Sequence, residues 1–141
     1  MKKKIIITGA GSAQANGVIN CLLLDNNGNE EIIGLGSDPY DLVMCRAHKK
    51  YLMPHSRDAR YKEALLKVLG SEKPSMIHFQ HDYELSVALC FRDEIEKLGV
   101  NMLIPDYETI DTCVHKYKSW VKFKEAGITV EFSGEGVEEI A

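Results

Sequence analysis

Proline, long apolar stretches and low-complexity segments are scarce in this chain of 141 residues. With only 4 prolines and 45% hydrophobic residues, the composition excludes fibrous and intrinsically disordered proteins. The basic start, residues 1–4, is followed by an apolar run of only Ile5 to Ile7. That run is far shorter than a signal-peptide core or a membrane span. We therefore expect a cytoplasmic globular protein that contacts no membrane.

Paired cysteines and an excess of basic residues are also absent. The 4 cysteines lie far apart in the sequence, which excludes a paired zinc knuckle and a close-spaced redox pair. Each lies in an apolar helical stretch, so we expect reduced, buried side chains at Cys21, Cys45, Cys90 and Cys113. The net charge of −4, with both signs interspersed, offers no basic field for a nucleic-acid partner.

Nucleophilic and metal-binding motifs cannot be assembled from the residues present. Ser12 and Ser86 lack the glycine-flanked turn of a nucleophile elbow, and the 5 histidines show no metal-ligand spacing. We therefore assign no catalytic residue and no metal site.

The chain does contain a regular alternation of strand and helix patterns. β-branched or apolar runs predict strands over residues 4–8, 32–35, 50–53, 76–79 and 100–104. Helical spacing predicts helices between them, one of which begins at an Asp58 cap and stops at Gly70, while another covers residues 84–98. Two further helices are predicted over residues 105–113 and 116–126.

This order predicts a Rossmann-like α/β fold, a mostly parallel five-stranded sheet with helices on both faces. A chain of this length is one ordinary domain and buries roughly two thirds of its unfolded surface. In such sheets, ligands bind beyond the carboxyl ends of the strands. Candidate site residues are therefore sought directly after each predicted strand.

A glycine-rich loop follows the first predicted strand. Gly9 and Gly11 allow a tight turn, after which Ser12 and the free N–H groups of the next helix can face a ligand. The alternative is a turn that strand-to-helix packing alone requires. Gln14 replaces the third glycine of the dinucleotide fingerprint, which counts against a dinucleotide ligand.

Acidic and titratable residues follow the second and fourth predicted strands. Asp38 stands where a dinucleotide-binding domain places its ribose-binding acid, but Asp38 and Pro39 also form an ordinary turn and cap. His81, Asp82 and Glu84 could line a pocket for a polar molecule, or the two acids could simply favour the start of the next helix.

The ordered motifs of the chain resemble the N-terminal part of ATP-grasp ligases, and are most similar to the group of the carbamoyl-phosphate synthase large subunit. The resemblance covers residues 4–130. It rests on Ile-Thr-Gly-Ala-Gly at 7–11, Ser-Asp-Pro-Tyr at 37–40, His-Asp-Tyr-Glu-Leu at 81–85, Ile-Pro at 104–105, His-Lys at 115–116 and Glu-Ala-Gly-Ile-Thr-Val at 125–130.

The resemblance implies a pre-ATP-grasp domain over residues 1–114, the start of the ATP-grasp portion over 115–130, and a linker or truncated tail over 131–141. It implies a fragment of an ATP-dependent carboxylate-amine ligase, an enzyme forming carbon–nitrogen bonds, that is not catalytic alone. ATP and magnesium would bind in the full-length enzyme, with none tightly bound to this chain. The partners would be the remaining ATP-grasp domains or subunit and a small carboxylate or amine substrate, and a homodimer is compatible with this.

By position, the resemblance places Gly11, Ser12, Asp38, His81, Asp82 and Glu84 around the substrate. Lys116 matches a lysine that approaches the nucleotide, although His115 stands where the family usually has an aspartate. Two alternatives stay open. One is a stand-alone module that binds a small molecule or a partner, and the other is a nucleotide-binding Rossmann domain of the NAD class.

Overall fold

The structure, a computed structural model, describes residues 2–25 and 28–131. The chain divides into two compact units, Met1–Ile104 and Pro105–Ala141. The elements of the first unit are β1 Lys3–Ile7, α1 Ala13–Asp25, β2 Glu30–Gly36, α2 Pro39–Met44, β3 Lys49–Leu52, α3 Tyr61–Glu72, β4 Met76–His78, α4 Asp82–Leu89, α5 Arg92–Lys97 and β5 Asn101–Met102. Those of the second unit are α6 Tyr107–Val114 and α7 Lys116–Glu125.

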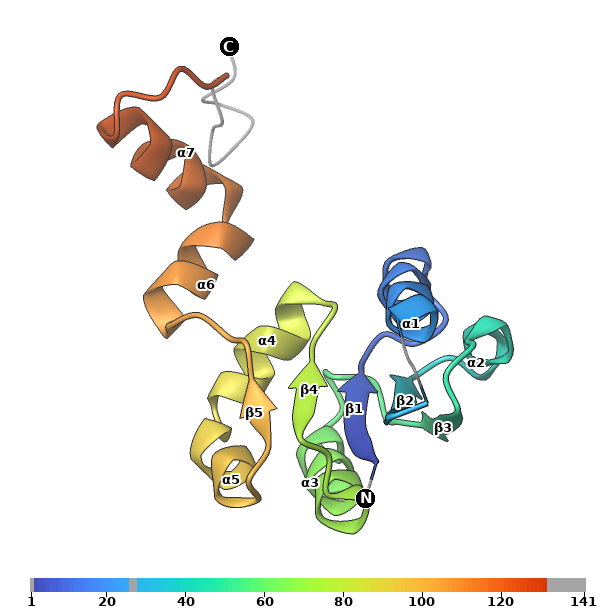
Figure 1. The fold of residues 1–141 in the computed structure, drawn as a ribbon. Helices are drawn as coiled ribbons and strands as arrows, with labels where there is room; N and C mark the ends of the chain where they lie inside the picture. Colours follow the sequence, from blue (N-terminus) through green and yellow to red (C-terminus); the bar gives the residue numbers. More distant parts are fainter. Residues whose placement is uncertain (1, 26–27, 132–141) are drawn as a thin grey trace. The chain divides into compact units, whose positions relative to one another are not determined.

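The first unit contains a five-stranded sheet in the order β3-β2-β1-β4-β5, in which every pairing is parallel (Figure 1). In the central register, Ile6 of β1 lies between Ile33 of β2 and Ile77 of β4. All three side chains are fully buried, as expected for β-branched strands covered on both faces. The predicted Rossmann-like α/β sheet is confirmed.

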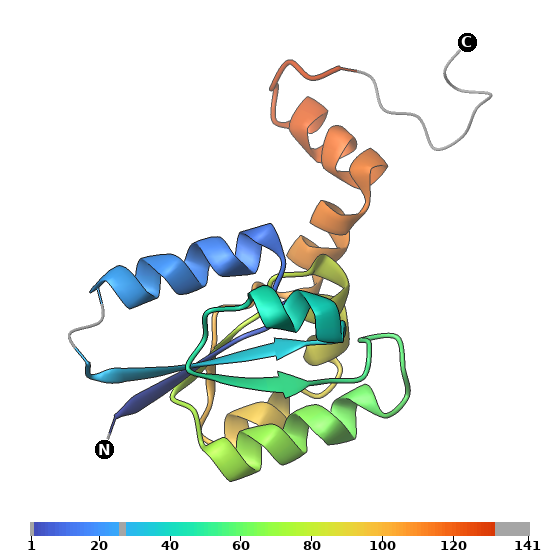
Figure 2. The ribbon, with the colours of Figure 1, turned by 90° about the vertical axis from the view of Figure 1, so that its right-hand side faces the viewer.

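Helices cover both faces of this sheet (Figure 2). On one face, Ala15 and Ile19 of α1 and Leu42 of α2 pack against Ile7 and Ile32. On the other face lie α3 and α5, whose buried side chains include Tyr61, Leu65, Leu69 and Ile95. Because strand order reverses between β1 and β4, the carboxyl ends of these two strands border the crevice where such sheets hold ligands.

Two boundaries of α3 differ from the prediction. The Asp58 carboxylate binds the backbone N–H and guanidinium of Arg60 and caps no helix, so α3 begins at Tyr61. Gly70 does not stop the helix either, which continues to Glu72. The stop comes from Lys73, which adopts a left-handed conformation with φ 49° before Pro74. A residue before proline is disfavoured in the α-helical region, which explains this end point.

The single helix predicted over residues 84–98 is wrong. The structure has α4 and α5 instead, separated at Cys90 and Phe91. The N–H groups of Cys90 and Phe91 bond to carbonyls three residues earlier, and the buried Phe91 leaves the helical conformation at φ −135°. Leu98, the last residue of that predicted helix, is 42% exposed. The helix is therefore interrupted at the position where the Phe91 side chain is buried.

The expected burial of the cysteines holds only for Cys45. Its side chain is 3% exposed and belongs to the core between α1, α2 and the sheet. Cys21, Cys90 and Cys113 are exposed, so the expectation of burial is wrong for these three. The apolar surroundings in the sequence did not distinguish the inward from the outward side of each helix.

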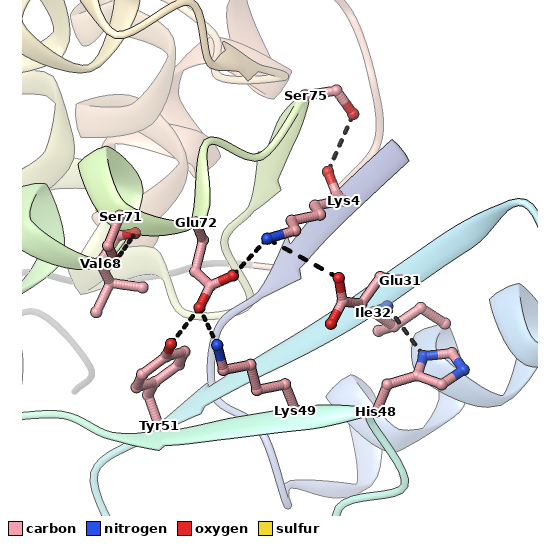
Figure 3. A network of polar contacts seen from close by, with 10 residues as sticks. All are labelled: Lys4, Glu31, Ile32, His48, Lys49, Tyr51, Val68, Ser71, Glu72 and Ser75. Carbon is pink, nitrogen blue, oxygen red and sulfur yellow. Dashed lines mark hydrogen bonds and ion pairs between the residues drawn. The ribbon is translucent and has the colours of Figure 1, made fainter. Parts of the chain in front are cut away.

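One buried carboxylate ties α3 to two strands, β1 and β3 (Figure 3). Glu72 is 6% exposed and accepts a hydrogen bond of 2.7 Å from the Lys4 ammonium of β1. It also accepts hydrogen bonds from Lys49 and Tyr51 of β3. These donors, Lys4 first, hold the pKa of Glu72 at about 2, below its ordinary value of 4.5. Glu31 of β2 lies 3.9 Å from the same Lys4 ammonium.

The second unit is an α-helical pair, as predicted for residues 105–113 and 116–126. The Asp106 carboxylate accepts a 2.8 Å hydrogen bond from the Thr109 N–H and caps α6. The Ser119 hydroxyl of α7 donates to the Thr112 carbonyl of α6 at 2.7 Å. On α7, the rings of Tyr117 and Trp120 stack with centroids 5.9 Å apart.

No helix in the described part of the chain is both long enough and apolar enough to span a lipid bilayer. Of the tail predicted over 131–141, residues 132–141 lie outside the described residues.

We expect Gly70→Ala to stabilise the protein. Gly70 lies inside α3, and a Cβ added there would meet no atom within 4 Å. Alanine is favoured over glycine in a helix interior by about 0.5–1 kcal/mol. Urea unfolding followed by circular dichroism would measure this gain, and a lower midpoint than that of the wild type would contradict it.

Candidate functional site

A cavity of about 260 Å³ opens at the carboxyl edge of the sheet. Its lining comes from the carboxyl ends of β1, β2, β3 and β4 and the segments that follow them, together with the first residue of α3. The lining residues are Gly9, Leu35, Gly36, Ser37, Met53, Pro54, His55, Ser56, Arg57, Tyr61, His81, Tyr83 and Glu84. This is the edge where parallel α/β sheets bind ligands.

A buried acid stands at this cavity. Glu84, in the first turn of α4, is 9% exposed. Its Oε2 accepts a 2.5 Å hydrogen bond from the Thr8 hydroxyl, directly after β1, and its Oε1 accepts a 3.1 Å bond from the Tyr61 hydroxyl of α3. Thr8 in turn accepts a 3.1 Å bond from the Gln80 N–H. The carboxylate therefore joins three segments that are distant in the sequence.

The donors to Glu84 are all uncharged. Within the described ranges, no lysine, arginine or histidine lies at ion-pair distance from its carboxylate. Burial raises the pKa of the Tyr61 hydroxyl far above its ordinary value, and the neighbouring Glu84 charge raises it further. Tyr61 is therefore a hydrogen-bond donor at every physiological pH.

Basic and imidazole groups come from two other loops. Arg57 and His55 follow β3, His81 follows β4, and all three side chains are exposed. The Arg57 guanidinium lies 5.0 Å from the centroid of the Tyr83 ring, which holds it against the cavity wall. The cavity thus combines an acidic buried group with hydrogen-bond donors that face solvent.

The glycine-rich loop after β1 has two different neighbours. Gly9, with φ 60°, lines the cavity, and a Cβ there would come within 2.7 Å of His81 Nε2. Gly11, with φ 106°, lies against α2 instead, since a Cβ would come within 2.3 Å of the Asp41 carbonyl oxygen. The loop therefore meets the cavity at its first glycine and the neighbouring helix at its second.

Of the six predicted substrate residues, the structure brings His81 and Glu84 to the cavity. The other four, Gly11, Ser12, Asp38 and Asp82, do not line it.

Three of these four have polar contacts or exposure at the start of a helix. The Ser12 hydroxyl accepts a 3.2 Å hydrogen bond from the Ala15 N–H at the start of α1. Asp38 caps α2 through bonds of 2.7 and 3.3 Å from the N–H groups of Tyr40 and Asp41. Asp82 is exposed in the first turn of α4. Ligand contacts of these four stay predictions.

Lys116, the predicted nucleotide contact, belongs to the second unit. It is the first residue of α7 and is exposed. It borders a shallow hollow of that unit with Ser119, Trp120, Phe123, Val130 and Glu131. The preceding His115 ring lies 2.8 Å from the Asp111 carbonyl oxygen. The role of Lys116 stays a prediction.

Sequence reasoning missed Thr8, Tyr61, His55 and Arg57 at this site. A signal existed for Thr8, because a hydroxyl that ends a buried strand must find a partner. Tyr61 lies in the helix predicted from Asp58 to Gly70, and its hydroxyl requires a hydrogen-bond partner when the ring is buried. His55 and Arg57 lie in a loop without regular spacing, so no pattern identifies them.

Among residues 2–25 and 28–131, no cluster of three or more histidine, cysteine or acidic side chains has the arrangement of a metal site.

No protein-family model matches the sequence, and no curated protein is similar to it in sequence. Solved structures do match. The chain is similar to the biotin carboxylase domain of a single-chain bacterial carboxylase, with TM-score 0.62 and 17% identity over 98% of this chain and 33% of that one. It is also similar to the biotin carboxylase domain of Hydrogenobacter thermophilus 2-oxoglutarate carboxylase in complex with MgADP, ADP and bicarbonate. That match has TM-score 0.60 and 18% identity over 99% and 32% of the two chains.

A third match is the multifunctional pyruvate carboxylase from Rhizobium etli, with TM-score 0.56 and 14% identity over 96% of this chain and 13% of that one. At these identities the likeness shows a shared fold. The chain spans about a third of the length of the biotin carboxylase structures.

Proposed function

We propose that this chain is the substrate-side, N-terminal part of an ATP-dependent carboxylase or ligase of the ATP-grasp type, and that it is not catalytic alone. The single observation that carries the proposal is the likeness to biotin carboxylase domains, which covers nearly the whole of this chain and about a third of theirs. The motifs that resemble ATP-grasp ligases support it independently of the fold. A carbamoyl-phosphate synthase-like specificity is the narrower form of the same proposal.

In this proposal the cavity beside Glu84 receives a small carboxylate or amine substrate, and other domains bind ATP. The cavity does not suit the nucleotide itself. Its volume of about 260 Å³ is below the usual range of roughly 300–1,000 Å³ for larger ligands, and the Glu84 carboxylate would repel phosphates. Residues 115–130 would begin the ATP-grasp portion, with Lys116 near the nucleotide.

We expect the isolated chain neither to bind MgATP tightly nor to hydrolyse it. Isothermal titration calorimetry with MgATP and a phosphate-release assay would check this. We also expect the native protein in its own cells to have about two to three times the mass of this chain, because one or two further domains would follow.

Two outcomes would contradict the proposal. Turnover of ATP by the isolated chain would show that it is not merely a part of the enzyme. A native mass equal to that of this chain would favour a stand-alone binding module or one subunit of a split enzyme. A fluorescence titration with NADH serves as the control, and we expect no change, because Gln14 replaces the third glycine of the dinucleotide motif.

A further inference from the structure

Among the described residues, no basic side chain lies at ion-pair distance from the Glu84 carboxylate. Its carboxylate is 9% exposed, and its protein donors are two neutral hydroxyls, one on each oxygen. A carboxylate offers about four acceptor sites, so each oxygen retains capacity for another donor. A buried charge without a counter-charge is costly, and a cation from the cavity would offset that cost. The buried end of the cavity is therefore suited to an ammonium group.

The exposed side of the cavity has the opposite preference. Arg57 presents a permanently charged guanidinium, whose position is restricted by the Tyr83 ring 5.0 Å away. His55 and His81 add imidazole groups that can donate N–H bonds, and Ser56 adds a hydroxyl. Guanidinium groups bind carboxylates through paired hydrogen bonds. The exposed side is therefore suited to an anionic group.

The volume of the cavity limits what can connect these two groups. The volume of about 260 Å³ lies below the roughly 300–1,000 Å³ of pockets that hold drug-sized ligands, so the cavity suits a smaller molecule. A compound of a few carbon atoms with an amine at one end and a carboxylate at the other is of this size. Leu35, Met53 and Pro54 supply the apolar wall along which its carbon chain would lie.

We propose that the cavity binds a small amino acid in its zwitterionic form, with the ammonium group at Glu84 and the carboxylate at Arg57. This inference rests on the proposed function and narrows it, because it places both an amine and a carboxylate on one substrate. Glu84 would bind the ammonium group and Arg57 the carboxylate. One series of titrations can therefore test the two contacts separately.

The experiment uses this chain and a panel of unbranched probes. Glycine, β-alanine, 4-aminobutyrate and 6-aminohexanoate are titrated by calorimetry, each beside an amine-only and an acid-only counterpart: ethylamine with acetate, propylamine with propionate, butylamine with butyrate, and hexylamine with hexanoate. We expect at least one amino acid to bind at least ten-fold more tightly than either counterpart of the same chain length.

Two variants test the ends separately. Glu84→Gln keeps the shape and a hydrogen-bond acceptor but removes the charge, so the preferred amino acid should lose at least ten-fold in affinity while butyrate is unaffected. Arg57→Gln should weaken the same amino acid without changing the affinity for butylamine. Glu63→Gln and Arg60→Gln are matched controls, since both residues are exposed and do not line the cavity. They should bind as the wild type does.

Circular dichroism and unfolding confirm that each variant is folded. If Glu84→Gln does not fold, Arg57→Gln with the amine-only and acid-only probes still decides the question. Equal affinity of an amino acid and its acid-only counterpart for the wild type, or full affinity in folded Glu84→Gln, would overturn the inference. The proposed function is judged by the native mass and by ATP turnover, so either proposal can fail while the other stands.

Discussion

Gly11→Ala is expected to destabilise the chain by about 4 kcal/mol, through backbone strain together with a steric clash. At φ 106° a side chain is strained whatever the surrounding space. The added Cβ would also come within 2.3 Å of the Asp41 carbonyl oxygen and 2.4 Å of its carbon. Because these are backbone atoms of α2, the helix itself would have to move away from the sheet. Urea unfolding at 25 °C would measure the loss.

The matched control is Gly17→Ala on the neighbouring α1. A Cβ at Gly17 meets nothing within 4 Å, so alanine should be neutral or slightly stabilising. Similar midpoints for Gly11→Ala and Gly17→Ala would contradict the account of Gly11 as a packing residue. The comparison also tests the predicted ligand contact of Gly11. If packing against α2 requires glycine at this position, no ligand is needed to explain the residue.

Glu72→Gln is expected to cost about 2 kcal/mol at pH 7, the usual value for charged hydrogen bonds lost from a buried group. The amide keeps the shape but cannot accept from Lys4, Lys49 and Tyr51 as the carboxylate does. The lysines would then lie beside a neutral group, and the attachment of α3 to β1 and β3 would weaken.

The same network predicts a dependence of stability on pH. The pKa of Glu72 is lowered from 4.5 to about 2 in the folded chain, so the unfolded chain binds more protons between these values. The stabilisation is therefore complete above about pH 4.5 and is lost as the pH falls toward 2. Urea midpoints of wild type and Glu72→Gln should differ at pH 7 and converge as the pH approaches 2.

Glu31→Gln is the control for this pair of measurements. Glu31 lies 3.9 Å from the same Lys4 ammonium, but its side chain is 34% exposed. Exposed ion pairs contribute roughly 0–1 kcal/mol, so this change should be small at both pH values. If Glu31→Gln lowered the free energy of unfolding as much as Glu72→Gln, burial of the carboxylate would not explain the stabilisation by Glu72.

The fold was predictable because β-branched or apolar runs alternate with helical patterns along the chain. The run Ile5 to Ile7 is β-branched and is followed by a glycine turn, a pattern typical of a buried parallel strand. Helix boundaries were less predictable, because they depend on competition between local and tertiary effects. The Asp58 carboxylate binds Arg60 and caps no helix, and the buried Phe91 interrupts a continuous helical pattern.

The candidate site was predictable only in its position at the sheet edge. The sequence placed His81 and Glu84 after a strand, and both do line the cavity. It could not distinguish them from Asp82, which does not line the cavity, because a run of polar residues does not indicate which side chains face inward. Tyr61 lies more than twenty positions from Glu84, and only the folded sheet brings their oxygens to 3.1 Å.

The bonds of Glu84 also have a consequence for local opening of the structure. Thr8, Tyr61 and Glu84 belong to three segments, and separating any one of them would leave a buried charge with one donor fewer. Partial unfolding of β1, α3 or α4 alone is therefore penalised at the same carboxylate. Amide protons in these three segments, the Gln80 N–H among them, should exchange with solvent as one cooperative unit, independently of the helical pair at the end of the chain.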